Sequence, residues 1–339
     1  MKARSNTLKL LPTLATLILL GCGAQNEGEN PTAAPATPAV DVSPAEPVSE
    51  AVEIRPAPSW QEGANTTYFG VLDEDIFMTD GSWVGEPYVE GGASAPRAGL
   101  AAGFLLTGDL DGDASEEAVV LVWSNTGGSG TFDYLAILDR DANGAVINRA
   151  TAPLGDRVKV RSATIEDGRI VVDVVQAGPE DAACCPGQKM RRTFALEGET
   201  MKETSAEDEG RLSLADLAGE WKLVRFGNDE AMPEGVEITL QFQDTTIAGK
   251  AACNRYTGSV APGDSPGSLS LAGPMAMTRM MCPHPLMDWE QRYAAALEGL
   301  AQFTFVAGRL VLSWRTDDET GTLVFARSGG GAGGETAGD

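Results

Sequence analysis

The sequence predicts an α+β protein of mostly antiparallel strands, arranged as two small β-rich domains. Short apolar runs with alternating polar positions recur along most of the chain and are separated by Gly, Pro and Asp turns. Helical spacing is sustained only at residues 289–300. A length of 339 residues leaves room for two ordinary domains and for terminal tails.

Residues 1–21 have the features of an export signal peptide. Lys2, Arg4 and Lys9 precede an apolar run that is too short to span a membrane as a helix. The run ends in Leu-Leu-Gly-Cys, which resembles the lipobox of bacterial lipoproteins and implies acylation of Cys22. The alternative is an ordinary signal peptide with an incidental cysteine. Gly23 is not the aspartate that favours inner-membrane retention in enterobacterial lipoproteins, so we expect a lipid anchor in the outer membrane, on its periplasmic or outer face.

Residues 22–59 are expected to form a disordered tether between this anchor and the folded part. The segment is rich in Ala, Pro and Glu, and it cannot bury enough apolar surface to offset the entropy of ordering. Over the whole chain, 49 acidic against 25 basic residues give a formal net charge of −24. This charge disfavours nucleic acid as a partner, because phosphate backbones recruit clusters of Lys and Arg.

Residues 60–198 are expected to form the N-terminal β-rich domain. Its apolar runs alternate with turn signals, and Asp167-Gly168 between two such runs predicts a hairpin. The run Gly127-Gly128-Ser129-Gly130 is too short for a nucleotide-binding fingerprint and is typical of a hairpin tip.

An acidic loop in this domain is a candidate calcium site. Asp109, Asp111, Asp113 and Glu117 occupy its positions one, three, five and nine, a spacing that lets carboxylates converge on a hard cation. Ala114 at position six and the absence of glutamate at position twelve exclude an EF-hand. The alternative is a polar turn whose aspartates accept hydrogen bonds from their own backbone. Ca²⁺ is therefore the candidate cofactor of this loop.

The adjacent pair Cys184-Cys185 allows three interpretations. A bond between neighbours would be strained, because adjacent Cα atoms lie about 3.8 Å apart, below the usual disulfide span. The pair could instead hold a soft metal, or form disulfides with Cys253 or Cys282, and sequence cannot choose among the connectivities. The motifs TGDLDGD, GGSGTF, LGDRV and Cys-Cys-Pro make residues 108–196 distantly similar to LppP/LprE-type bacterial lipoproteins.

The remaining chain is expected to contain a linker, a second domain and a tail. Residues 199–211 are charged and lack an apolar period, so they predict an interdomain linker. Short strand-like runs follow in residues 212–327, together with a helix from Trp289 to Leu300 for which Asp288 is the expected N-cap. Residues 328–339 are Gly-rich and are expected to be disordered.

The second domain has a recognisable pattern. Asn254, Arg255 and Tyr256 follow Cys253, and Thr278-Arg279-Met280 precedes Cys282. With Leu217, Gly219 and Trp221 ahead of it, residues 217–327 resemble the META domain of HslJ-like bacterial proteins. The resemblance implies a compact, barrel-like α+β domain with one helix and a role in envelope stress or maintenance. Ala252 stands where a glycine is common in that family.

Cys253 and Cys282 are expected to form a disulfide. They stand in neighbouring strand-like segments, and the Pro/Gly turn at residues 262–267 allows these segments to run antiparallel. Export would also place both thiols in an oxidising compartment.

The densest group of soft ligands in the chain surrounds Cys282. Thioether, thiolate and imidazole groups together are what Cu(I) selects. Strand alternation, however, sends Met275 and Met277 to one face, where methionine is an ordinary core residue, so core packing is the favoured interpretation. His284 lies between two prolines and is expected to be extended and exposed. The full group is Met275, Met277, Met280, Met281, Cys282, His284 and Met287.

No catalytic motif is recognisable, so we do not expect an enzyme. The chain has one histidine and no nucleophile elbow, zinc-protease helix or phosphate loop. The favoured function is a non-enzymatic lipoprotein anchored in the outer membrane, acting in envelope stress response or maintenance through contacts with an envelope protein or a ligand. The alternative is a periplasmic inhibitor or scavenger that binds a basic hydrolase or a metal ion, for which the acidic surface would provide electrostatic steering.

Overall fold

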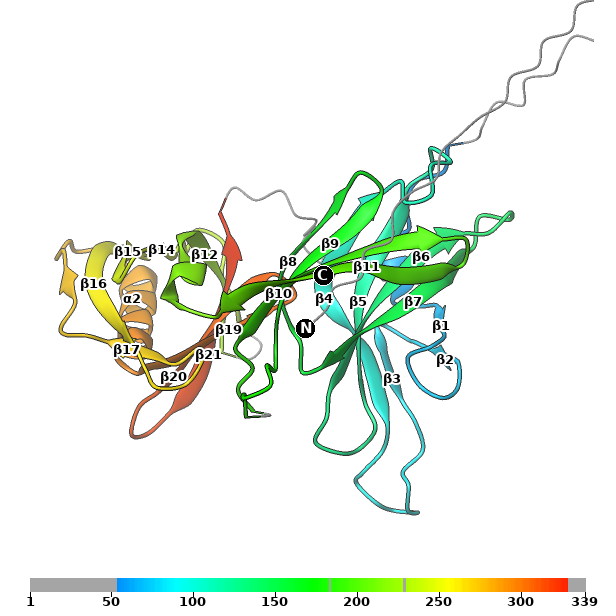
Figure 1. Cartoon of the computed structure of the whole chain (residues 1–339). Helices are drawn as coiled ribbons and strands as arrows, with labels where there is room; N and C mark the ends of the chain where they lie inside the picture. The colour runs from blue at the N-terminus through cyan, green and yellow to red at the C-terminus, as the bar shows by residue number, and fades with distance from the viewer. Residues whose placement is uncertain (1–53, 183, 228–229, 329–339) are drawn as a thin grey trace, which may run out of the picture. The chain divides into compact units, whose positions relative to one another are not determined.

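The structure, a computed structural model, describes residues 54–182, 184–227 and 230–328 (Figure 1). Every strand pairing within these ranges is antiparallel, and they contain two α-helices. The predicted fold class, α+β with mostly antiparallel strands, is confirmed. The predicted signal peptide, Cys22, most of the predicted tether and the predicted tail beyond Ser328 lie outside the described residues.

The N-terminal β-rich part contains a five-stranded sheet, a four-stranded sheet and a small hairpin. The strand order is β3-β4-β5-β6-β7 in the larger sheet and β11-β10-β9-β8 in the smaller one, while β1 pairs with β2. The elements are α1 (Trp60–Gly63), β1 (Thr67–Tyr68), β2 (Ile76–Phe77), β3 (Ser82–Val84), β4 (Arg97–Gly108), β5 (Glu117–Asn125), β6 (Phe132–Arg140), β7 (Val146–Asp156), β8 (Lys159–Glu166), β9 (Arg169–Gln176), β10 (Gln188–Glu197) and β11 (Thr200–Arg211).

Strand β5 is buried on both faces, which explains its continuous apolar run. Val119 and Leu121 join one core cluster, together with Val172 and Phe194 of the four-stranded sheet. The alternate residues, such as Val120, face a second cluster on the other side of the sheet. Because successive side chains of a strand point to opposite faces, one run of apolar residues serves both clusters.

The hairpin predicted at Asp167-Gly168 is confirmed. Strands β8 and β9 pair up to Glu166 and Arg169, and Asp167 and Gly168 both have positive φ angles of 50° and 70°. Two consecutive positive φ angles are typical of the tight turn that matches the twist of a hairpin.

Contacts with the first domain begin before Trp60, where the sequence placed the start of that domain. The Arg55 guanidinium donates hydrogen bonds to the carbonyl oxygens of Arg140 and Asp141, at 2.8 and 2.9 Å. Ser59 caps α1 in a reciprocal capping box with Glu62. Residues 55–59 of the predicted tether therefore contact the folded domain.

The predicted linker, residues 199–211, was wrong for Thr200–Arg211, which forms strand β11. Ten residue pairs join it to β10. As the outer strand of its sheet, β11 buries Met201 but leaves almost every other side chain exposed. It therefore shows no apolar alternation, and its charges suit an edge strand that must not pair with another chain.

The C-terminal part is a ten-stranded sheet around one helix. The main order is β17-β16-β15-β14-β12-β21-β20-β19, with β13 beside β12 and β18 beside β16. The elements are η1 (Leu214–Leu217), β12 (Gly219–Phe226), β13 (Glu230–Ala231), β14 (Thr239–Gln243), β15 (Thr246–Ala251), β16 (Asn254–Pro262), β17 (Leu269–Leu271), β18 (Ala276–Met277), α2 (His284–Glu298), β19 (Leu300–Val306), β20 (Arg309–Arg315) and β21 (Thr320–Arg327).

This sheet is nearly closed into a barrel. An isolated bridge between Ser268 and Gln302 brings the two ends of the strand order together, and the Phe303 amide donates to the Gly267 carbonyl at 2.7 Å. Trp289, Tyr293 and Leu297 of α2 pack into the core that the strands enclose. The expected barrel-like sheet with one helix is therefore present.

Helix α2 begins earlier than predicted. It starts at His284, with Pro283 as N-cap, so Asp288 lies inside the helix and is not its cap. Proline is tolerated in the first helical turn, where amide groups have no partner within the helix. His284 is therefore helical and not extended; its side chain is 87% exposed, as expected, and contacts Asp288 Oδ2 at 2.8 Å through Nδ1.

Candidate functional site

The motif residues of the C-terminal domain converge where β16 begins. The Cys253–Cys282 disulfide joins the turn between β15 and β16 to the segment before α2, with the two Cα atoms 6.1 Å apart. Neither cysteine lies in a strand, contrary to the sequence interpretation. Ala252, in the position where glycine is common, has a φ of 62°, a left-handed conformation that favours glycine.

Asn254 is the centre of a buried hydrogen-bond network. Its side-chain carbonyl accepts from the Thr278 hydroxyl and from the Met280 amide, both at 2.7 Å. Its side-chain amide donates to the Met280 carbonyl and to Glu290 Oε1, both at 3.1 Å. Glu290 Oε2 accepts from the Asn254 backbone amide at 2.7 Å. Together with the disulfide, Asn254 therefore holds residues 278–282 against β16 and α2.

A second buried polar pair lies close by in the barrel core. The hydroxyls of Tyr256 and Tyr293 are 2.8 Å apart, and Tyr256 also donates to the Thr239 carbonyl at 3.0 Å. Burial raises the pKa of both phenols above the ordinary value. Since both groups stay protonated at physiological pH, they act as structural hydrogen-bonding groups.

A hollow of about 410 Å³ opens beside this network. Met280 and Met281, on the segment that Asn254 holds, are 56% and 98% exposed. Core packing, the favoured interpretation of the methionine group, is therefore correct for Met275 and Met277, which pack against the barrel core, but wrong for Met280 and Met281. The hollow is lined by Asn254, Met277, Thr278, Arg279, Met280, Met281, Met287 and Glu290.

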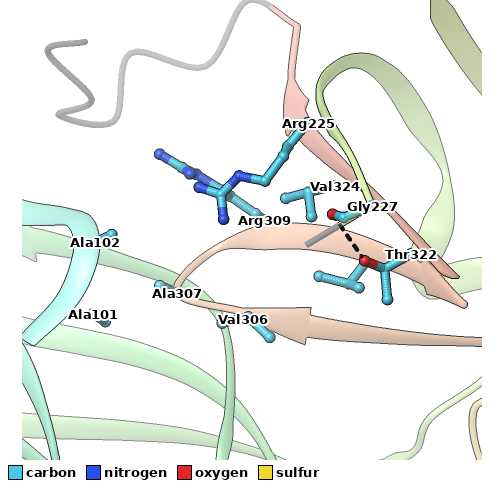
Figure 2. A pocket seen from close by; sticks show the side chains of 10 residues that line it. Ala101, Ala102, Arg225, Gly227, Val306, Ala307, Arg309, Thr322 and Val324 are labelled. Carbon is cyan, nitrogen blue, oxygen red and sulfur yellow. Dashed lines mark hydrogen bonds between the residues drawn. The ribbon is translucent and has the colours of Figure 1, made fainter. Parts of the chain in front are cut away.

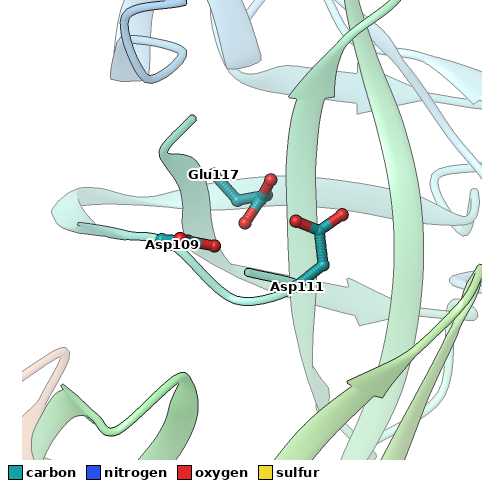
Figure 3. Close-up of side chains that lie close together, drawn as sticks. All are labelled: Asp109, Asp111 and Glu117. Atoms are coloured by element: carbon teal, nitrogen blue, oxygen red, sulfur yellow. The ribbon is translucent and has the colours of Figure 1, made fainter. Parts of the chain in front are cut away.

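The acidic loop brings together three of its four predicted ligands (Figure 3). One carboxylate oxygen from each of Asp109, Asp111 and Glu117 lies within 4.8 Å of the others. Asp113 is not part of this group, and its carboxylate accepts from the Ser115 amide at 2.7 Å. Asp109 accepts from the amides of Gly112 and Ala114, as the alternative interpretation of a polar turn requires. The loop thus combines a group of three close carboxylates with the backbone hydrogen bonds of a polar turn.

Arg149 supplies the positive charge at this acidic group. Its Nη1 lies 2.7 Å from Asp111, 3.1 Å from Asp139 and 3.7 Å from Glu117. Glu117 is 1% exposed, and burial raises the pKa of its carboxyl to about 7, although the Leu110 amide and Arg149 oppose the change. A cation entering the site would compete with Arg149 for Asp111.

Cys184 and Cys185 are free thiols in the structure, so neither pairs with Cys253 or Cys282. The hydrogen bond with Cys184 raises the pKa of the Cys185 thiol. Asp181 holds the same loop by accepting from the amides of Gly178 and Gly187, both at 2.8 Å, and from Arg211.

Another hollow, of about 250 Å³, is lined by none of the residues that the sequence singled out (Figure 2). Arg225 of β12 and Arg309 of β20 line it beside Val324. Burial lowers the pKa of the Arg309 guanidinium, and the charge of Arg225 lowers it further. At the margin of this hollow, the Thr322 hydroxyl donates to the Gly227 carbonyl, at 3.2 Å.

Sequence reasoning missed Glu290 and Arg149. The burial of Glu290 could have been predicted from the sequence. It lies three and seven residues before Tyr293 and Leu297, so it shares the buried face of the helix. Arg149 gave no such signal, because the strand register that brings it to the acidic loop cannot be read from the residues around it.

No helix among the described residues is long and apolar enough to cross a membrane.

Comparisons with known proteins identify one domain of the chain. No curated protein matches the chain. A solved NMR structure of a protein from Burkholderia xenovorans is 27% identical, covers 38% of this chain and 96% of its own, and has a TM-score of 0.27. The family model of the META domain matches residues 213–329, which include the barrel, its helix and the Cys253–Cys282 disulfide. This chain therefore carries a META domain at residues 213–329.

Proposed function

We propose that this chain is a lipoprotein of the bacterial cell envelope, anchored through Cys22 in the outer membrane, and that it acts by binding and not by catalysis. The observation that carries the proposal is the Cys253–Cys282 disulfide of the META domain. Structural disulfides persist in oxidising compartments and are rare in the cytosol. The export-type leader with its Leu-Leu-Gly-Cys ending supports the same destination.

Binding is favoured over catalysis by the arrangement of polar groups at the META motif. Asn254 is hydrogen-bonded to both Thr278 and Glu290, and Tyr256 pairs with Tyr293. These groups stabilise the fold and hold a surface segment in place. The META domain is also not a known enzyme family. A role in envelope stress response or maintenance follows from the META resemblance and is part of the proposal.

Fractionation of a Cys22→Ser variant tests the anchor. If Cys22 carries the lipid, the variant is recovered in the soluble periplasmic fraction while the unaltered chain stays with the outer membrane. A Cys184→Ser variant is the matched control and should remain in the membrane. A Cys22→Ser variant that still fractionates with membranes would overturn the proposed anchor. Crosslinking in intact envelopes before and after heat or cell-wall antibiotics would then identify the binding partner.

An inhibitor of a basic hydrolase is the second candidate. The formal net charge of −24 would attract a basic partner over a long range. The edge strand β11 carries Glu207, Asp208 and Glu209, whose exposed side chains such a partner could contact. Lysozyme is a suitable basic probe. Capture of lysozyme by the chain at low salt, lost at high salt and accompanied by inhibition, would favour this candidate; capture without inhibition would count against it.

A further inference from the structure

The hollow beside Asn254 has an unusual set of donor atoms. Met277, Met280, Met281 and Met287 all line it, so four of the ten methionines of the chain share one site. Met280 and Met281 come from the segment between β18 and α2, and Met287 from the first turns of α2. Methionine side chains are long, unbranched and adaptable, so thioethers on facing walls can converge on one ion.

The oxygen donors of the same hollow are already engaged. The Thr278 hydroxyl donates to Asn254 and accepts from the Arg255 amide at 3.1 Å. Both oxygens of Glu290 accept from Asn254. What the hollow offers a ligand is therefore mainly thioether sulfur, which suits soft cations and not Ca²⁺ or Mg²⁺.

The segment that carries the two exposed methionines is fixed on both sides. Asn254 binds both the amide and the carbonyl of Met280, and the disulfide holds Cys282 two residues later. Ligand groups held in place before binding lose less conformational entropy when they bind. Met281 is 98% exposed, so burial in the core cannot account for it.

We propose that this hollow binds a soft monovalent cation of the Cu(I) class through the thioethers of Met280, Met281 and Met287. Thioethers are uncharged soft ligands. Arg279, which lines the same hollow, repels a divalent ion more strongly than a monovalent one. This inference goes beyond the proposed function and does not depend on the anchor, because the hollow lies wholly within the META domain.

Silver(I) is the probe, since it is a soft monovalent cation that needs no reductant to stay in that state. Thiols would also bind it, so the experiment uses the full chain with Cys22→Ser, Cys184→Ser and Cys185→Ser. Methionine methyl groups labelled with ¹³C are followed by NMR as silver nitrate is added. The methyls of Met280, Met281 and Met287 should shift and saturate together, while those of Met190 and Met201, in the other domain, stay unchanged.

Calorimetric titration of matched variants completes the test. Replacement of Met280, Met281 and Met287 by Leu preserves volume and should abolish saturable silver binding, whereas Met190→Leu should leave it intact. Binding should persist at pH 5, because thioethers do not compete with protons as thiolates and imidazoles do. Uniform shifts of all methionine methyls, or undiminished binding by the triple Leu variant, would overturn the proposal. Competition with a Cu(I) chelator, carried out on the same variants, then extends the result to copper.

Discussion

The backbone amide of Asn254 donates to Glu290 Oε2 at 2.7 Å, between two residues that are 1% and 7% exposed. This bond joins the start of β16 to α2 across 36 positions of sequence. Because the Asn254 side chain binds Glu290 and Met280 as well, one asparagine connects a strand, a helix and a surface segment. The Cys-Asn element of the META motif therefore has a structural explanation.

Replacing Asn254 with Ala should destabilise the META domain markedly. The change leaves the Met280 amide and Glu290 Oε1 without the Asn254 side chain, while Glu290 Oε2 keeps its bond from the backbone amide of residue 254. Each unsatisfied buried group costs about 1–3 kcal/mol. We expect a total loss of about 2–4 kcal/mol in the free energy of unfolding, measured by urea denaturation. Asn143→Ala, on an exposed turn, is the control and should stay within about 0.5 kcal/mol. Equal effects of the two variants would contradict this account of Asn254.

The Cys253→Ser variant should also unfold more easily. Cys253 and Cys282 are 29 residues apart, and closing a loop of that length stabilises a protein by roughly 3–4 kcal/mol in the chain-entropy model. The melting temperature should fall by a similar amount in Cys282→Ser and in the double variant, because each removes the same bond. Mass mapping of protein taken from the envelope provides the direct check. Free thiols at both positions, or a bond from either to Cys184 or Cys185, would contradict the prediction.

Stability should fall as the pH rises from about 4.5 towards 7. Burial raises the pKa of both Glu117 and Asp133 to about 7, from ordinary values of 4.5 and 3.8. The folded state therefore holds these protons more tightly than the unfolded state, and the stability they contribute is lost as the pH rises through this window. Glu117→Gln and Asp133→Asn should each remove part of the slope in urea denaturation. Glu116→Gln, at an exposed neighbour, should leave it unchanged, and a slope that survives the Glu117 and Asp133 changes together would refute the assignment.

Calcium should bind the acidic loop weakly. Asp109, Asp111 and Glu117 offer three close carboxylates, but Arg149 already binds Asp111 at 2.7 Å and must be displaced. We expect a dissociation constant on the order of 10⁻⁴ to 10⁻³ M, in the range of extracellular calcium modules. Millimolar calcium should raise the melting temperature of the chain, and Asp111→Ala should abolish the increase while Asp264→Ala preserves it. Without any increase, the loop is a polar turn only.

The parts of the fold that depend on local pattern were predictable from sequence. The Asp167-Gly168 hairpin follows from turn chemistry, and the helix that carries Trp289, Tyr293 and Leu297 follows from their spacing. Its start was placed too late because the residue before a proline usually avoids helical angles, and His284 is an exception at the first turn.

The candidate sites were only partly predictable, because their partners come from distant strands and helices. Arg149 reaches Asp111 across 38 positions, and Glu290 reaches Asn254 across 36. Asp113 has the right spacing for a cation loop, but its carboxylate accepts a hydrogen bond from the nearby Ser115 amide. Spacing within one segment therefore identified the candidate ligands. Which of them lie close together in the fold depends on the tertiary contacts.

Strand β11 determines where the chain can be cut to give a folded N-terminal fragment. Its charged residues would suggest a cut near Gly198, yet such a cut would remove the outer strand of the four-stranded sheet and leave the backbone of β10 without its partner. Only Leu212 and Ser213 separate the end of β11 from η1, where the C-terminal elements begin. A fragment of the N-terminal half should therefore extend through Arg211, since shorter fragments would expose an unpaired strand edge and aggregate.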